Sequence, residues 1–252
     1  EDDEILEVDG ISLNREIALV GMNSLSLANN MFMDEEVIEI LESPWISQLR
    51  ALNLEWNDIG DAAAAAIAGC DALHGLERLS LRGCQVGEKG AMSLARAGAT
   101  SGVGTLRALD ISSTSGVPEA VDEAMALRLM HQDLPSRYWI DALVDRKGQW
   151  SGLHELNMSD LLLELEPDDV DELSRQPHLQ SLKTLELANV GMTPDVVERL
   201  LSSEGVFTEL TELNLNRNHD LQRAVASALA ELALPSLRRL KGRECGLKDE
   251  DI

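Results

Sequence analysis

Apolar residues recur along the chain in one short pattern, in which leucine-like side chains occupy the first, fourth and sixth places of a unit. LRALNL at 49–54 and LRALDI at 106–111 are two nearly identical copies. Seven units carry all three apolar residues and an eighth keeps two, and they start at Met22, Leu49, Leu76, Leu106, Leu153, Leu182, Leu210 and Leu237. Successive starts are 27, 27, 30, 47, 29, 28 and 27 residues apart. The chain is therefore a series of repeats with one enlarged interval.

Each repeat predicts one strand followed by one helix. Apolar residues at the fourth and sixth places alternate with polar ones, as in a half-buried strand. The ninth place holds Asn or Cys in five of eight repeats and reads Asn30, Asn57, Cys84, Thr114, Leu161, Val190, Asn218 and Cys245. A side chain there can turn inward and satisfy backbone groups after the strand. Helices are expected to follow, with Asp34 and Thr193 as N-caps and Pro194 in a first turn.

The combined spacing L-x-x-L-x-L-x-x-N/C-x-L resembles that of leucine-rich repeat proteins over residues 22–252. The period of 27–30 residues, with a helical second half, is similar to the ribonuclease-inhibitor-like subfamily. The resemblance implies an α/β fold: a curved solenoid of about eight repeats, with one parallel sheet on the concave side and helices on the convex side. Strands are expected near residues 25, 52, 79, 109, 156, 185, 213 and 239.

Residues 1–21 are expected to form an N-terminal cap before the repeat domain at 22–252. LEVDGISL at 6–13 alternates around Asp-Gly, which is the signal for a two-residue β-hairpin. Such a hairpin would cover the open edge of the first repeat, and the alternative is a degenerate repeat. The chain lacks an initial Met and stops where another helix is expected to begin. We therefore expect it to be part of a larger protein.

The charge of the chain is strongly acidic, and this changes the choice of partners. The 252 residues carry 45 acidic and 21 basic side chains, for a net charge of −24. Residues 1–42 and 153–213 each sum to −11, residues 43–152 to −3 and residues 214–252 to +1. Binding to nucleic acid is not expected, because phosphates require a basic surface. An acidic surface favours basic protein partners, and the alternative is that the charge serves only solubility.

No residue pattern points to catalysis, a cofactor or a metal. The five histidines do not form a metal-binding motif, and the glycine-rich stretch at 98–106 lacks a phosphate-binding signature. The three cysteines are expected to be reduced structural thiols, which favours a cytoplasmic location. No apolar run is long enough to span a membrane, and no signal peptide is visible. The expectation is therefore a non-enzymatic protein without membrane contact.

Candidate partner-binding residues are taken from places that project onto the concave face, and from the enlarged interval. They are Trp56, Arg78, Arg82, Asp110, Glu155, Glu186, Asn214, Arg217, Tyr138 and Trp139. Trp56 stands out because tryptophan and arginine dominate the energetics of protein interfaces. The alternative for Trp56 is packing under a neighbouring loop, whereas Trp45 is expected in the core.

The 47-residue interval predicts an aromatic helical insertion at about 125–152. Apolar residues at 139/140 and 143/144 form a helical stripe. The insertion either packs on the convex side or contacts a partner. If its helix docks, Ile140 and Leu143 are expected to point inward, with Trp139 at the margin.

The function favoured by these patterns is protein–protein recognition by a non-catalytic module. One alternative is a regulator of an enzyme, similar to ribonuclease inhibitors or GTPase activators, although this chain has only three cysteines and no convincing GTPase-activating loop. Another alternative is a structural scaffold within an assembly. The sequence names neither the partner nor the oligomeric state.

Overall fold

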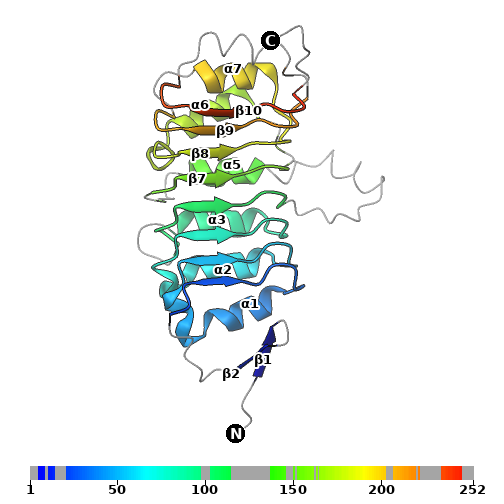
Figure 1. Ribbon diagram of the computed structural model, residues 1–252, viewed down its shortest axis with the longest axis vertical. Coiled ribbons are helices and arrows are strands. Elements are labelled where there is room, and N and C mark those ends of the chain that lie inside the picture. Colours follow the sequence, from blue (N-terminus) through cyan, green and yellow to red (C-terminus); the bar gives the residue numbers. More distant parts are fainter. Residues whose placement is uncertain are drawn as a thin grey trace, which may run out of the picture.

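The computed structural model describes residues 5–8, 11–14, 21–97, 103–114, 137–145, 150, 152–161, 163, 165–202, 207–219, 221 and 234–245. Within these ranges, eight short parallel strands form one sheet in which sequence neighbours are also spatial neighbours (Figure 1). The strands are β3 (Ser24–Ser26), β4 (Ala51–Asn53), β5 (Arg78–Ser80), β6 (Ala108–Asp110), β7 (Glu155–Asn157), β8 (Thr184–Glu186), β9 (Glu212–Asn214) and β10 (Arg239–Lys241).

The register of the sheet follows directly from the leucine spacing. The fourth place of each repeat lies opposite the fourth place of the next, from Leu25 opposite Leu52 to Leu213 opposite Leu240. These central side chains point away from the concave face, and those of β4 to β9 are buried. The predicted parallel solenoid is therefore confirmed, with the last strand centred at Leu240 rather than at residue 239.

Helices cover the other face of the sheet, behind the strands in Figure 1. The α-helices are α1 (Asp34–Leu41), α2 (Asp61–Gly69), α3 (Glu88–Arg96), α5 (Arg137–Val144), α6 (Pro167–Ser174) and α7 (Pro194–Ser202). Short 3-10 helices precede three strands: η1 (Pro44–Gln48), η2 (Asp71–Leu73) and η3 (Pro177–Leu179). As expected, Trp45 in η1 is buried in the core. The expected start of α7 is also confirmed, since Thr193 Oγ1 accepts the Val196 N–H.

The ninth place of the repeat supports the turn after the strand, as the sequence predicts. Asn57 is buried, and its amide group donates to the carbonyls of Leu27 and Leu54 at 2.8 and 2.9 Å. Cys84 makes the corresponding contact through its thiol, which lies 3.2 Å from the Leu54 carbonyl. Burial raises the pKa of Cys84 to about 12, so the thiol stays protonated and remains a donor. Thiol and amide thus occupy equivalent places in neighbouring repeats.

The predicted N-cap at Asp34 is wrong, because Asp34 is already the first residue of α1 and Met33 precedes it as the cap. Its carboxylate accepts the Gly60 and Ala62 N–H groups, at 2.7 and 3.2 Å. Asp61 likewise accepts N–H groups at the start of α3. Each carboxylate therefore caps the helix of the following repeat, where the free N–H groups and the helix dipole favour negative charge.

The aromatic helix at the enlarged interval is a regular part of the helix layer. Helix α5 packs against α3 on one side and α6 on the other, so it is the convex helix of the fourth repeat (Figure 1). Of the two expected roles for the aromatic helix, packing on the convex side is the one observed, and the bounds of the insertion at about 125–152 stay a prediction. Most of the extra length falls between Thr114 and Arg137, where residues 115–136 lie outside the described part.

The expected orientation of Trp139 is also wrong. Trp139 is fully buried, together with Ile140 and Leu143, while Tyr138 is 8% exposed. The Tyr138 hydroxyl donates to the Val86 carbonyl at 2.6 Å and also lies 3.3 Å from the Thr114 carbonyl. Tyr138 therefore holds α5 against the preceding repeats, and Trp139 packs beside it in the core. Neither is placed to contact a partner directly, because burial leaves almost no surface for one.

His178 joins α5 to the next repeat, and we expect this contact to make the stability of the protein depend on pH. Its Nε2 lies 3.0 Å from the Leu143 carbonyl, and its ring packs edge-on against Trp150. Burial lowers the pKa of His178, so the folded protein binds this proton less readily than the unfolded chain does. The contribution of His178 to stability is therefore complete above the ordinary histidine pKa of about 6.5, and is lost as pH falls towards the folded-state pKa.

We expect wild-type protein to lose more stability between pH 7.5 and 5.5 than a His178→Gln variant, which keeps a side-chain donor but cannot titrate. Urea unfolding at the two pH values measures the difference. The many carboxylates titrate in both proteins, so their effect cancels in the comparison. Equal losses in the two proteins would contradict the assignment.

At the N-terminal end, strands β1 (Ile5–Val8) and β2 (Ile11–Asn14) pair antiparallel, with Val8 opposite Ile11. A strand pair is therefore present where the Asp-Gly signal predicts it. It forms a sheet separate from the eight-stranded one, so it does not extend that sheet by pairing with β3. The division into a cap at 1–21 and a repeat domain at 22–252 stays a prediction.

Candidate protein-binding site

The concave face is lined by the third and fifth places of each repeat, because side chains alternate along a strand. In the C-terminal part of this face, charged residues neutralise one another. Lys241 Nζ lies 3.0 Å from Glu186 and 2.7 Å from Glu212, and Arg239 lies 2.7 Å from Glu212. Asn214 also donates to Glu186. The predicted site residues Glu186 and Asn214 are thus already engaged within the molecule.

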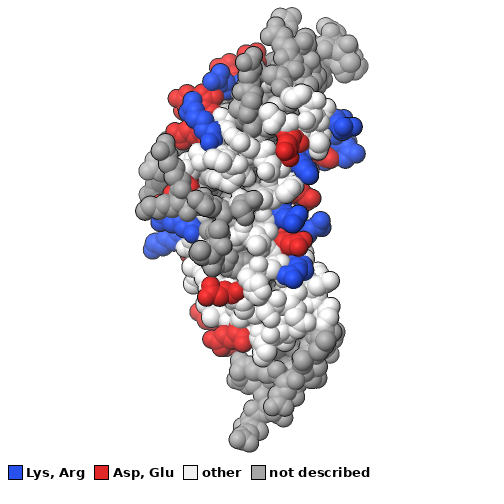
Figure 2. All heavy atoms as spheres, turned by 90° about the vertical axis from the view of Figure 1, so that its left-hand side faces the viewer, with Lys and Arg blue, Asp and Glu red and all other residues white. Residues whose placement is uncertain are grey.

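These contacts affect protonation at the same cluster. The ammonium of Lys241 holds the pKa of Glu212 below its usual value, while Glu212 and Glu186 raise the pKa of Lys241. Glu212 and Lys241 are therefore both charged near neutral pH. Figure 2 shows basic and acidic side chains following one another along the sheet side, at the right of that view. This part of the sheet is a self-paired polar surface rather than a patch of one sign.

In the middle of the concave face, neutral donors form hydrogen bonds to the Asp110 carboxylate. Asp110 accepts the Ser112 N–H at 2.9 Å and the Asn157 amide at 3.0 Å. Glu155 is exposed on the neighbouring strand. Arg217 lies at the strand exits, 3.7 Å from Asp160. The predicted residues Asp110, Glu155 and Arg217 therefore share one side of the molecule without converging on a single point.

The exit of each strand has a backbone feature that sequence reasoning missed. The eighth place of all eight repeats has a φ angle between 54° and 65°, in the left-handed region: Asn29, Trp56, Gly83, Ser113, Asp160, Asn189, Arg217 and Glu244. Asn, Asp and Gly tolerate this conformation best, and they fill four of the eight places. That enrichment is the signal that could have revealed the turn. A bulky tryptophan is the least expected residue here.

Trp56 is fitted to this turn by its neighbours in the next repeat. A Cβ atom at Gly83 would lie only 2.3 Å from the Trp56 ring, so the ring packs where glycine leaves space. The Arg82 guanidinium lies 5.7 Å from the centre of the ring, within the range of a cation–π contact. Even so, 38% of Trp56 is exposed. Among the residues that the structure describes, Trp56 is therefore not packed under a neighbouring loop, which was the alternative expectation.

Two arginines of the third repeat lie on this side of the molecule, Arg82 against the Trp56 ring and Arg78 at the start of β5. Arg78 is exposed on β5, between Ala51 and Ala108 in the sheet register, so neither neighbour at its own level offers a counter-charge. Arg82 Nε is buried, with no hydrogen-bond partner among the described residues. The structure therefore brings Trp56 and Arg82 together, with Arg78 two residues before Ser80 on the same strand. Among the described residues, the guanidinium groups of Arg78 and Arg82 lack the ion pairs that Lys241 forms with Glu186 and Glu212.

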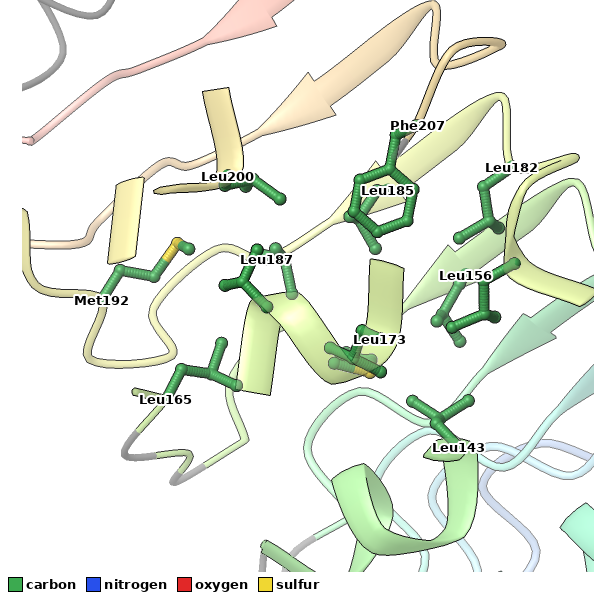
Figure 3. Close-up of a pocket in the computed structure, with 13 residues that line it drawn as sticks. Leu143, Leu156, Leu165, Leu173, Leu182, Leu185, Leu187, Met192, Leu200 and Phe207 are labelled. Carbon is green, nitrogen blue, oxygen red and sulfur yellow. The ribbon is translucent and has the colours of Figure 1, made fainter. Parts of the chain in front are cut away.

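The enclosed space in the core offers no binding site. A cavity with a volume of about 20 Å³ lies between strands β7 and β8 and helices α5 to α7, lined only by apolar side chains such as Leu156, Leu185, Leu187, Met192 and Phe207 (Figure 3). Space of this size holds at most one water, and an apolar lining gives that water no partner. The cavity is therefore a gap in packing.

The described residues hold neither a candidate metal site nor a membrane-spanning helix. Within the described ranges, no group of three or more His, Cys, Asp or Glu side chains is placed to hold a metal ion. The described helices are all too short or too polar to cross a membrane. Among the described side chains around Trp56, no nucleophile lies in contact with a base.

Comparison with known proteins finds similarity to leucine-rich repeats in two segments of the chain. A family model described as "Leucine Rich repeat" matches residues 47–68 and 74–95, which include Trp56, Arg78, Arg82 and Gly83. No curated protein sequence matches the chain. Among solved structures, the crystal structure of human 5T4 (Wnt-activated inhibitory factor 1, trophoblast glycoprotein) is 22% identical, with a TM-score of 0.47. That match covers 88% of this chain and 70% of the other.

Proposed function

We propose that this leucine-rich-repeat chain is a non-catalytic protein-recognition module whose principal contact is the strand-exit edge around Trp56. The observation that carries the proposal is a large aromatic side chain, 38% exposed, in a left-handed turn. Tryptophan and arginine are the residues that most often dominate interface energies, and here Arg82 and Arg78 accompany it. The self-paired charges near Lys241 are less suited to this role, since a partner would have to separate them.

Two finer proposals accompany this function. The 27–30-residue spacing and the helices of the second half-repeats support assignment to the ribonuclease-inhibitor-like subfamily. The three free cysteines support a reducing compartment such as the cytoplasm, because two of them are buried thiols with structural hydrogen bonds.

The test is affinity capture with three baits followed by quantitative mass spectrometry: wild type, Trp56→Ala and Lys89→Ala. Lys89 is an exposed residue of α3 on the convex side, so its variant serves as a control. With the partner purified, Trp56→Ala is expected to weaken binding by about 2 kcal/mol, or roughly 30-fold, at an unchanged urea midpoint. A partner that binds all three proteins equally well would refute the role of Trp56.

A further inference from the structure

The exposed large apolar residues among those described all lie in the first two repeats. They are Met31, Met33 and Trp56, with 84%, 50% and 38% of their surfaces exposed. Scattered exposed apolar residues are common, but a group of three on adjoining segments indicates a contact surface. We call this group, together with the acidic residues of 29–62, the acidic rim.

Hydrogen bonds show that the two segments of the acidic rim adjoin. The Asn29 N–H donates to the Glu55 carbonyl at 2.9 Å. The N–H groups on both sides of Met31, those of Asn30 and Phe32, donate to Asn57 Oδ1 at 3.0 Å each. Met31 is therefore held at the strand-exit edge, next to the turn that carries Trp56.

The backbone at these residues is not explained by stability alone. Met31 and Trp56 both have a φ angle of 55°. A left-handed conformation is unfavourable for a residue with a Cβ atom, and a side chain that stays exposed offsets little of that cost, because it buries little apolar surface. The tenth place of the sixth repeat has the same left-handed backbone, but there it is filled by glycine, at Gly191 with a φ angle of 71°. Bulky apolar side chains at these turns are better explained by a contact outside the chain.

The charge around these apolar groups identifies the kind of partner. Residues 29–62 contain eight acidic side chains and one basic one, Arg50. Asp34 and Asp61 are used as helix caps. The other acids are Glu35, Glu36, Glu39, Glu42, Glu55 and Asp58, and none of them forms an ion pair with a described residue. Negative charge is thus left unbalanced around an exposed apolar group.

We infer that the acidic rim binds a protein segment rich in lysine and arginine that carries apolar side chains. This inference rests on the proposed function, since it assigns a partner class to the same Trp56 edge. Apolar groups of the partner would cover Met31, Met33 and Trp56, while its cations approach Glu35 and Asp58. Arg82 bounds the rim on the side of the third repeat and repels further cations there, which gives the segment a preferred direction.

The test uses three synthetic twelve-residue peptides without tryptophan: one of lysine and leucine, one of lysine and serine, and one of glutamate and leucine. Trp45, Trp139 and Trp150 are at most 7% exposed, so acrylamide quenching of fluorescence reports mainly on Trp56. The lysine–leucine peptide is expected to protect Trp56 and to bind at least about tenfold more tightly than the others. Its association should slow as salt rises.

Charge-reversal variants locate the site. Glu35→Lys/Asp58→Lys is expected to weaken binding of the lysine–leucine peptide by about tenfold or more. The matched control is Asp195→Lys/Glu198→Lys, which makes the same change of net charge on α7, where both residues are exposed. Urea unfolding of each variant verifies that the fold is retained.

The outcomes separate this inference from the proposed function. Equal weakening by both double variants, no binding to wild type, or equal binding of the three peptides would overturn the assignment of a basic, apolar partner. The capture result with Trp56→Ala would still stand. If sedimentation equilibrium shows self-association that Trp56→Ala abolishes, the rim is occupied by a second copy of the chain and the inference is wrong.

Discussion

Truncation of Trp139 to alanine is expected to lower the free energy of unfolding by about 3–5 kcal/mol, the usual cost of removing a buried tryptophan side chain. The side chain is fully buried between repeats, and its neighbour Tyr138 packs against it with ring centres 5.8 Å apart. Chemical denaturation with urea measures the loss. Affinity for a partner, corrected for the folded fraction, should be unchanged, because the Trp139 side chain is fully buried and cannot contact a partner.

A milder substitution on the same helix keeps this prediction testable if Trp139→Ala does not fold. Tyr138→Phe removes only the hydroxyl that donates to the Val86 carbonyl, and should cost about 1–2 kcal/mol as a buried acceptor loses its partner. Should Trp139→Ala retain its urea midpoint and yet lose affinity, the residue would be a contact and its burial would not hold in solution.

A comparable loss is expected from Leu185→Ala, at about 2–5 kcal/mol. Leu185 is 4% exposed and lies between Leu156 and Leu213 in the interior of the leucine ladder. It also borders the small cavity in Figure 3, so truncation enlarges an existing gap. Apolar neighbours on all sides leave little freedom for the site to collapse, which places the cost in the upper part of the range.

The matched control for Leu185 is Leu240→Ala, in the same place of the last described strand. Leu240 is half-buried and pairs with a strand on one side only, so it should cost clearly less. The comparison uses the urea midpoint and its slope for both variants. A loss below about 1 kcal/mol at Leu185, or an equal loss at both positions, would show that the ladder does not carry the stability.

The sequence by itself determined the strands, their order and their register. Every repeat places leucine at the same fourth and sixth positions, and one repeat cannot bury its apolar face without the next. Stacking repeats of similar length therefore aligns Leu25 with Leu52 and all their successors. The role of the ninth position could also be predicted from the sequence, because Asn57 or Cys84 satisfies backbone groups of its own turn and the adjoining one.

The sequence predicted only some of the residues of the candidate site. Trp56 and Arg82 were selected because tryptophan and arginine on a concave edge are unusual, and the structure places them in contact. Gly83 was not selected, since its role depends on a tryptophan 27 residues earlier. Met31 was missed because the repeat pattern says nothing about the loop between strand and helix.

Tertiary structure decided which chemically similar groups meet between repeats. Asp34 caps the helix that follows rather than its own, and Lys241 reaches Glu186 across 55 residues. A helical stripe containing both Trp139 and Ile140 does not show which of them faces inward, and here both are buried. Periodicity can be read from the sequence alone, because it depends only on the spacing of residues along the chain. Contacts between repeats depend on how far each side chain reaches across the stack, and only the folded arrangement specifies that.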